Sequence, residues 1–410
     1  MLGVHVVAGS NPATPTPKPY GFGARPPAES PPIIAIDEPA LRQHDSIVAY
    51  PSMRAIASAA IGAAAMLLGA VSASAAQCGP FGDPPAEVNH GWFASFITRY
   101  TPVCRGGKVL GPWKDAGGDE RRACLYKPDS AARRSPLPLV VFLHGSLATA
   151  DSVSYTGLID LIDKADLGGK QPGFILLAPE GRYTSHFYPG LDANALGWDN
   201  WYRQLSPSGE VTIGGTAYQE NVDAGAIDHF ISELQAKGIV DSRRIYLMGW
   251  SNGAAMAMLY ALNRPQVAAA AVYSAPDPFA ALFDVCPQTP AAVAPSGDGQ
   301  LRVANPRVPL MHVRNDCDIG GICPNASRFA SRMRAMGGSI EDVILDPSGT
   351  SVTSCDEACG TDEMADGQVS RRAAFRGFVH HIRWPVARNK DMLDFLKQHP
   401  LGAPAVSPKQ

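Results

Sequence analysis

The chain has 410 residues, a formal net charge of −3 and 45% hydrophobic residues, as expected for a globular protein with one large or two ordinary domains. This balance leaves no excess of basic side chains for phosphate contacts, so we expect no nucleic-acid partner. The eight cysteines include no C-x-x-C pair, which argues against a zinc site. We therefore expect no metal and no cofactor, and the even cysteine count fits disulfide bonds in an exported protein.

Residues 1–52 are rich in proline and show neither a helical nor a strand period. Such a composition predicts a disordered segment. Because a signal-peptide pattern begins only at Met53, we interpret the upstream segment as an over-extended reading frame.

Residues 53–76 have the composition of a secretory signal peptide. One arginine precedes an apolar run, and Ala73-Ser74-Ala75 fits an A-x-A cleavage site. The run is too rich in Ala, Gly and Ser for a typical membrane-spanning helix. We therefore expect cleavage near Ala75 or Ala76, secretion into the extracellular space or the periplasm, and no stable membrane association.

Residues 77–403 contain no internal repeat, charge block or long low-complexity linker, which predicts one domain followed by a short tail at 404–410. Continuous apolar runs at Leu137–Leu143 and Phe174–Pro179 predict strands that are buried on both faces. The apolar spacing within residues 221–237 predicts an amphipathic helix.

The second half of this domain continues the alternation of strands and helices, after an aromatic and glycine-rich excursion at 184–219. Strands that alternate with helices predict a mostly parallel α/β sheet flanked by helices. The later expected elements are strands at Ala268–Ser274 and Val308–Val313, a helix at Met333–Met336, a late strand that ends at Phe378–Val379, and a closing helix at Asp391–His399.

The stretch Arg244–Leu262 carries the strongest chemical signal. Its apolar start predicts a buried strand, Gly249-Trp250-Ser251-Asn252-Gly253 predicts a tight turn, and the remainder predicts a helix. Strand, G-x-S-x-G and helix in this order form a nucleophile elbow, which holds the serine hydroxyl at the tip of the sheet. We therefore predict an α/β-hydrolase fold with Ser251 as the nucleophile. The alternative is a serine that only caps the helix.

A nucleophilic serine needs a histidine base and a carboxylate that orients it, and in this fold the acid follows the serine along the chain. The strand Val308–Val313 leads to two candidates, Asp316 and Asp318. Asp316 is preferred because it lies four residues after His312, the offset of the acid in H-G-x-x-D endings.

The base is expected last in the chain. His380 and His381 form the only histidine group in the last hundred residues before the closing helix, and His399 lies in or beyond that helix. His381 is preferred over His380 because it is nearer to Trp384-Pro385.

Ester hydrolysis also needs N–H donors for the developing oxyanion. One is the amide of Asn252, directly after the nucleophile. The early strand ends in His144-Gly145-Ser146, where glycine lets the backbone turn toward a substrate, so we predict the Ser146 amide as the second donor. His144 and His312 are expected to shape their loops through hydrogen bonds.

Four segments of the chain resemble the esterase and polyhydroxybutyrate (PHB) depolymerase family of α/β-hydrolases, to which secreted feruloyl and acetylxylan esterases are related. They are LVVFLHGS, GWDNWYRQ, GIVDSRRIYLMGWSNGAAMA and HHIRWP, within residues 130–398. In that family an aromatic segment before the elbow helps to wall the substrate site. The resemblance therefore implies Trp198 and Trp201 as substrate-binding residues, beside Trp250 in the elbow itself. Packing under a loop is the alternative for Trp198 and Trp201.

The chain departs from the family pattern in two places. Val313 stands where the family usually has glycine before the acid. Ile382 and Arg383 both separate His381 from Trp384, whereas the family tends to have H-x-W-P. The choice between the two histidines therefore stays open.

The cysteines near the acid suggest disulfide bonds without defining their connectivity. Cys317 and Cys323 flank the acid loop, so a bond between them, or one from Cys286, could fix Asp316. Cys355 and Cys359 are close enough in sequence to pair with each other.

These features predict a secreted, monomeric serine carboxylic-ester hydrolase that acts through an acyl-enzyme on polyhydroxyalkanoate or hydroxybutyrate esters. A feruloyl or acetylxylan type of esterase acting on plant polysaccharide is the main alternative. A peptidase or thioesterase, and a non-catalytic binding protein with a hydrolase fold, are less favoured.

Overall fold

The computed structural model describes residues 102–128, 136–187, 191–198, 211–213, 216–218, 222–278, 304–319, 322–356, 359 and 371–402. All of them belong to one of the two units into which the chain divides, Met66–Gln410. The predicted segments 1–52, 53–76 and 404–410, and also Trp201, lie outside the described residues. Within the described part, every helix is too short or too polar to span a bilayer.

A sheet of nine strands forms the centre of the described part, in the order β1-β2-β4-β3-β9-β10-β11-β12-β13. The six strands from β4 to β12 in this order run parallel to their neighbours, while β1, β2 and β13 pair antiparallel. The strands are β1 (Lys108–Lys114), β2 (Glu120–Tyr126), β3 (Leu137–Leu143), β4 (Ile175–Pro179), β9 (Val240–Trp250), β10 (Ala269–Tyr273), β11 (Leu310–Asn315), β12 (Ile340–Leu345) and β13 (Ser351–Val352).

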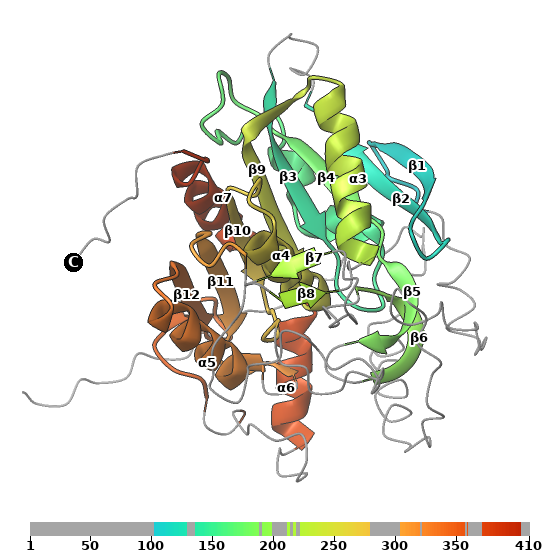
Figure 1. Ribbon diagram of the computed structural model, residues 1–410. Helices are drawn as coiled ribbons and strands as arrows, with labels where there is room; N and C mark the ends of the chain where they lie inside the picture. The colour runs from blue at the N-terminus through green and yellow to red at the C-terminus, as the bar shows by residue number, and fades with distance from the viewer. Residues whose placement is uncertain are drawn as a thin grey trace, which may run out of the picture. The chain divides into compact units, whose positions relative to one another are not determined.

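Helices and short hairpins connect these strands (Figure 1). Two hairpins are formed by β5 (Arg182–Phe187) with β6 (Leu191–Gly197) and by β7 (Val211–Ile213) with β8 (Thr216–Tyr218). They coincide with the predicted excursion at 184–219, except that β5 begins two residues before it. The helices are α3 (Val222–Ala236), α4 (Asn252–Asn263), α5 (Ile322–Ala335), α6 (Arg371–His381) and α7 (Asn389–Gln398), with 3-10 turns η2 (Ala150–Tyr155), η3 (Ile159–Leu161) and η5 (Val386–Arg388).

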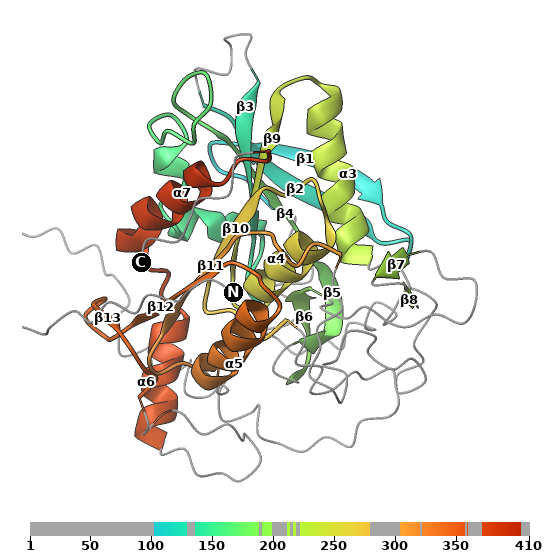
Figure 2. The ribbon, with the colours of Figure 1, turned by 60° about the vertical axis from the view of Figure 1, so that its left-hand side comes forward.

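Alternate residues of the central strands enter two hydrophobic clusters, one on each face of the sheet. On β3, Leu139 and Val141 join the cluster that contains α3, α4 and α5, whereas Val140 and Phe142 join the cluster that contains α7 and η2. Figures 1 and 2 show α3 and α7 on opposite sides of the sheet. Burial on both faces explains why β3 is apolar at every position, and it confirms the prediction of a mostly parallel sheet flanked by helices.

The predicted late strand ending at Phe378–Val379 is wrong, because these residues lie in α6. The apolar residues Phe375, Phe378, Val379 and Ile382 follow the i, i+3, i+4, i+7 spacing of a helix. The two residues Phe378 and Val379, on which the strand was predicted, are too few to show this helical spacing. These side chains are 36% to 56% exposed, so the apolar face of α6 points away from the sheet.

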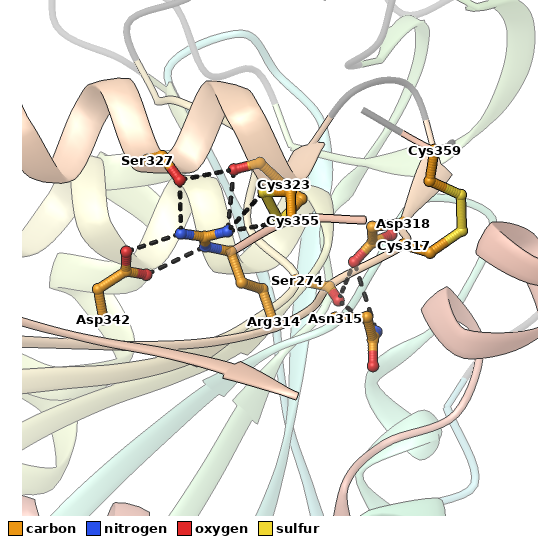
Figure 3. Close-up of a disulfide and its surroundings, with 10 residues drawn as sticks. All are labelled: Ser274, Arg314, Asn315, Cys317, Asp318, Cys323, Ser327, Asp342, Cys355 and Cys359. Carbon is orange, nitrogen blue, oxygen red and sulfur yellow. Dashed lines mark hydrogen bonds and ion pairs between the residues drawn. A yellow bond between two sulfur atoms is a disulfide. The ribbon is translucent and has the colours of Figure 1, made fainter. Parts of the chain in front are cut away.

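Three disulfides join the described cysteines, which confirms that such bonds occur but not the pairs suggested from spacing. Cys104 pairs with Cys124, near the start of the described part. Cys317 pairs with Cys359 and Cys323 with Cys355, so the second bond is nested inside the first along the chain. Figure 3 shows both bonds beside the loop that follows β11.

Candidate active site

Ser251 lies at a strained turn between β9 and α4. Its backbone angles, φ 55° and ψ −122°, fall in a region that side chains other than glycine seldom adopt. A Cβ on Gly253 would lie 2.1 Å from the carbonyl oxygen of His144, and one on Gly249 would lie 2.5 Å from that of Gly253. Glycine at both positions therefore lets α4 begin close against the end of β3, as the G-x-S-x-G pattern requires.

His381, at the end of α6, connects the serine to a carboxylate. Its Nε2 lies 2.7 Å from Ser251 Oγ, and its Nδ1 lies 2.7 Å from Asp318 Oδ1. A carboxylate can only accept, so Nδ1 carries the proton and Nε2 is free to accept the serine hydroxyl. This is the arrangement of a histidine that can remove a proton from Ser251.

Asp318 is buried and fully hydrogen-bonded. Its Oδ2 accepts from Ser274 Oγ at 2.6 Å, and its Oδ1 also accepts from the Ile319 amide at 2.8 Å. Burial raises the pKa of this carboxyl, but the proximity of His381 and these hydrogen bonds outweigh it, so the pKa of Asp318 is lowered. The group therefore stays ionised beside the histidine.

The preference for Asp316 over Asp318 is contradicted by this geometry. The Asp316 amide still donates to Leu345 O on β12 at 2.8 Å, so Asp316 prolongs the edge of β11 and its carboxyl lies near Arg376 and Asp356 rather than His381. The four-residue offset from His312 therefore leads to a residue that is still paired with β12. Asp318, two residues later, is the first carboxylate that reaches His381.

The preference for His381 over His380 agrees with the geometry. The backbone oxygen of His380 accepts from Tyr273 Oη at 2.7 Å, while its Nδ1 has no hydrogen-bond partner among the described residues. Among the described residues, the ring of His380 forms no hydrogen bond with Ser251.

The loop after β3 crosses directly over the serine. A Cβ on Gly145 would lie only 3.3 Å from Ser251 Cβ, so a larger residue would press on the nucleophile. Within the described residues, neither the Ser146 amide nor the Asn252 amide donates to a recorded acceptor. Ser146 directly follows Gly145 and Asn252 directly follows Ser251, so both predicted donors belong to the two segments that meet at the nucleophile.

Trp198 does not line the site, contrary to the substrate-binding role predicted for it. Its side chain is completely buried, and its Nε1 donates to His144 O at 2.8 Å. Its amide donates to Asn252 Oδ1 at 2.7 Å. Trp198 therefore packs under the loop that follows β3 and links that loop to the start of α4.

Trp250 is half-buried, and its side chain contacts residues that surround the site. Its Nε1 donates to His381 O at 2.8 Å, and its ring contacts those of Tyr273 and Trp384. These contacts of the indole hold the backbone of His381.

His144 and His312 shape loops through hydrogen bonds, as predicted. The Gly181 amide donates to His144 Nε2 at 2.9 Å, and the Ala275 amide donates to His312 Nε2 at 3.0 Å. Burial lowers the pKa of His144 to about 4, and burial together with Arg314 lowers that of His312 to about 3. Both rings are therefore neutral acceptors at neutral pH.

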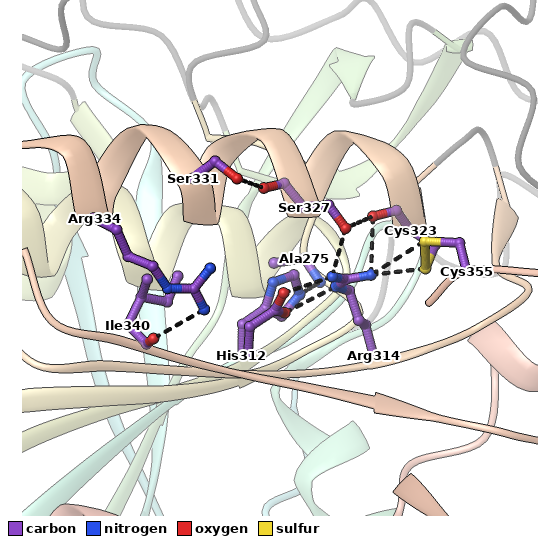
Figure 4. A network of polar contacts seen from close by, with 10 residues as sticks. Ala275, His312, Arg314, Cys323, Ser327, Ser331, Arg334, Ile340 and Cys355 are labelled. Atoms are coloured by element: carbon purple, nitrogen blue, oxygen red, sulfur yellow. Dashed lines mark hydrogen bonds and ion pairs between the residues drawn. A yellow bond between two sulfur atoms is a disulfide. The ribbon is translucent and has the colours of Figure 1, made fainter. Parts of the chain in front are cut away.

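Arg314 anchors the strand from which the acid loop leaves. Its buried guanidinium makes two bonds to Asp342 on β12, at 3.0 and 2.7 Å (Figure 3). It also donates to Cys323 O and Ser327 Oγ on α5, at 2.9 and 2.8 Å (Figure 4). Such complete pairing is what makes a buried charge tolerable. Together with the nested disulfides, it fixes the base of the loop that carries Asp318.

Sequence reasoning missed three polar residues beside this site: Tyr273, Ser274 and Asn315. All three stand at the ends of β10, which pairs with the elbow strand β9, and of β11, which is the next parallel strand in the sheet. Polar residues at the carboxyl ends of such strands are a signal that could have marked them.

A mostly parallel sheet with helices on both faces and a serine elbow after β9 defines the class of this protein, the α/β-hydrolase fold. Residues 122–280 match the family model described as "Esterase PHB depolymerase". Over these residues the chain is similar to that family.

Solved structures of esterases resemble the chain at low identity. A thermostable esterase shares 15% identity at a TM-score of 0.44, over 73% of this chain and 64% of its own. A ferulic acid esterase shares 17% at 0.40, over 61% and 92%, and a thermophilic esterase from the Planctomycetes species Thermogutta terrifontis shares 16% at 0.39, over 62% and 86%. The chain thus spans 64% of the length of the first of these structures. Among curated proteins none matches.

Proposed function

We propose that this protein is a secreted carboxylic-ester hydrolase with Ser251 as nucleophile, His381 as base and Asp318 as the acid that orients the base. The observation that carries the proposal is the unbroken chain of two 2.7 Å hydrogen bonds from Ser251 through His381 to the buried Asp318. The disulfides support the secreted location, because such bonds persist in oxidising compartments.

In the first half of the reaction, His381 Nε2 takes the proton of Ser251 as Oγ attacks the ester carbonyl carbon. The amides of Ser146 and Asn252 donate to the oxyanion that forms. His381 then gives the proton to the leaving alcohol, and the acyl group remains on Ser251.

In the second half, a water molecule gives its proton to His381 and attacks the acyl carbon. The same amides hold the second oxyanion. When the intermediate collapses, the Ser251–acyl bond breaks, the proton returns to Oγ, and the carboxylic acid leaves. Asp318 remains ionised and balances the charge on His381 in both halves.

We further propose an apolar oligoester, such as a hydroxyalkanoate, as the substrate class. The matched family description names PHB depolymerases, and the exposed apolar face of α6 supports an apolar partner. Phe375, Phe378, Val379 and Ile382 form this face, and the same helix ends in His381.

The proposal is tested by labelling the protein with a fluorophosphonate and locating the adduct by mass spectrometry. We expect one adduct on Ser251, none on a Ser251→Ala variant, and turnover of p-nitrophenyl butyrate by the wild type. Labelling without turnover of any short ester would contradict the esterase function. Turnover of feruloyl or acetylated sugars, with none of hydroxybutyrate oligomers, would move the substrate to plant polysaccharide.

The apolar face of α6 leads to a prediction about chain length. For Phe378→Ser, we expect kcat/KM for p-nitrophenyl octanoate to fall about tenfold, since burying an aromatic side chain against an acyl chain is worth about 1.5 kcal/mol or more. The value for p-nitrophenyl acetate should hardly change, because we expect its acyl group to be too short to reach Phe378.

Tyr155→Ser is the matched control, because Tyr155 is an aromatic residue on η2 that is 77% exposed. Tyr155→Ser should leave kcat/KM unchanged for both the acetate and the octanoate ester. Equal losses for acetate and octanoate in Phe378→Ser would show that α6 does not select chain length.

A further inference from the structure

Ser274 has a backbone conformation that costs a serine free energy. It follows β10, is completely buried, and has φ 50°, in the left-handed region. Its amide donates to Val313 O at 2.8 Å, so the sheet itself imposes this conformation. Glycine would adopt it without a steric penalty. The serine side chain must therefore contribute something that offsets the strain.

The hydroxyl of Ser274 contributes a bond to the acid. Ser274 Oγ donates to Asp318 Oδ2 at 2.6 Å (Figure 3), while Asn315 Nδ2 is farther from that oxygen, at 3.5 Å. With Oδ2 held, the carboxylate cannot rotate about its Cβ–Cγ bond. Oδ1 then stays directed at His381 Nδ1.

The preceding residue, Tyr273, reaches the base. Its buried Oη donates to His380 O at 2.7 Å and accepts from Asn315 Nδ2 at 2.8 Å. His380 directly precedes His381, so this bond fixes the backbone on which the catalytic ring is mounted.

Tyr273 also contacts the nucleophile through its backbone. Its carbonyl oxygen accepts from the Ser251 amide at 3.0 Å. The tip of β10 therefore touches the backbone of the serine, the backbone next to the base, and the carboxylate of the acid. β10 is itself paired on both sides, with β9 and β11, which makes it a rigid reference for all three.

We propose that Tyr273 and Ser274 are positioning residues, which from the tip of one strand set the Asp318 carboxylate and the His381 ring at hydrogen-bond distance. The proposal rests on the proposed esterase function. Within the described residues, neither side chain forms a hydrogen bond with Ser251 Oγ, so both act through the residues that they hold.

Two variants of Ser274 separate positioning from stability. Ser274→Ala and Ser274→Gly both lose the hydroxyl, and for both we expect kcat on p-nitrophenyl butyrate to fall by about 10- to 100-fold, the size of effect that misplaced catalytic groups produce. KM should change little. Because glycine relieves the left-handed strain, Ser274→Gly should melt about 2–4 °C above Ser274→Ala without recovering activity.

Ser152→Ala is the matched control, because Ser152 is a buried serine whose Oγ has no hydrogen-bond partner among the described residues. We expect it to retain wild-type kcat. If Ser274→Gly regained kcat together with its melting temperature, Ser274 would be purely structural and the proposal would be overturned.

Tyr273→Phe tests the second contact while keeping the packed ring. We expect kcat to fall again at nearly constant KM. The double variant with Ser274→Ala should lose less than the product of the two single losses, because both act on the same pair, Asp318 and His381. If the loss of kcat in the double variant equalled the product of the two single losses, the shared role of Tyr273 and Ser274 would be overturned.

The wild-type reaction distinguishes this proposal from the one on which it rests. Normal wild-type turnover with unchanged kcat in all three single variants would overturn the positioning role alone. A wild type that neither turns over esters nor labels at Ser251 would overturn both proposals.

Discussion

His381→Gln is expected to lower kcat by about a millionfold, the loss seen when the base of a serine hydrolase is removed. Glutamine can fill much of the same space, but its amide cannot take the proton of Ser251, whose Oγ lies 2.7 Å from His381 Nε2. The remaining rate would come from substrate binding and from the Ser146 and Asn252 amides. Rates of ester hydrolysis and of fluorophosphonate labelling, both measured on the folded variant, test this expected loss.

His380→Gln is the matched control for that variant. The two histidines are adjacent, but only the ring of His381 contacts Ser251 and Asp318 in the described part of the chain. The bond from Tyr273 goes to the backbone of His380 and survives the substitution. A larger loss in His380→Gln than in His381→Gln would reverse the assignment.

Asp318→Asn is expected to lower kcat by about 10⁴-fold, with the fold intact. The carboxylate accepts the Nδ1 proton of His381. An asparagine can turn its NH₂ group toward Nδ1 instead, which places the ring proton on Nε2 and blocks acceptance from Ser251. Steady-state kinetics on p-nitrophenyl butyrate, with circular dichroism to verify folding, would measure the loss.

Asp316→Asn provides the comparison, since it makes the same chemical change two residues away. Burial raises the pKa of the Asp316 carboxyl, which interacts with the charges of Arg376 and Asp356 rather than with His381. Its loss should leave kcat close to that of the wild type. A collapse of activity in Asp316→Asn with little change in Asp318→Asn would restore the original preference for Asp316.

The parts of the fold that follow from local patterns could be predicted from the sequence. Uninterrupted apolarity in Leu137–Leu143 is required by burial on both faces, and the glycines of the elbow are required by approaches that no Cβ permits. Each of these constraints acts within a few residues, so each leaves a readable pattern.

The details that failed depend on where separate segments meet. The choice of Asp316 assumed that the strand stops soon after His312, but pairing with β12 carries it to Asn315 and beyond. The disulfide partners depend on how α5 and β13 bring Cys323 and Cys355 together. Similarly, an aromatic residue before the elbow is compatible with packing and with substrate contact. Only the burial of Trp198 under the loop that follows β3 decides for packing.

The nested disulfides have a consequence for a chain that has been cut. Between Cys323 and Cys355 the chain passes through an exposed turn at Ser348 and Gly349, the kind of site at which proteases nick folded domains. A cut there would separate the polypeptide that bears Asp318 from the one that bears His381. Two bridges would still join them, so a nicked enzyme would migrate as one species until a reductant split it into two.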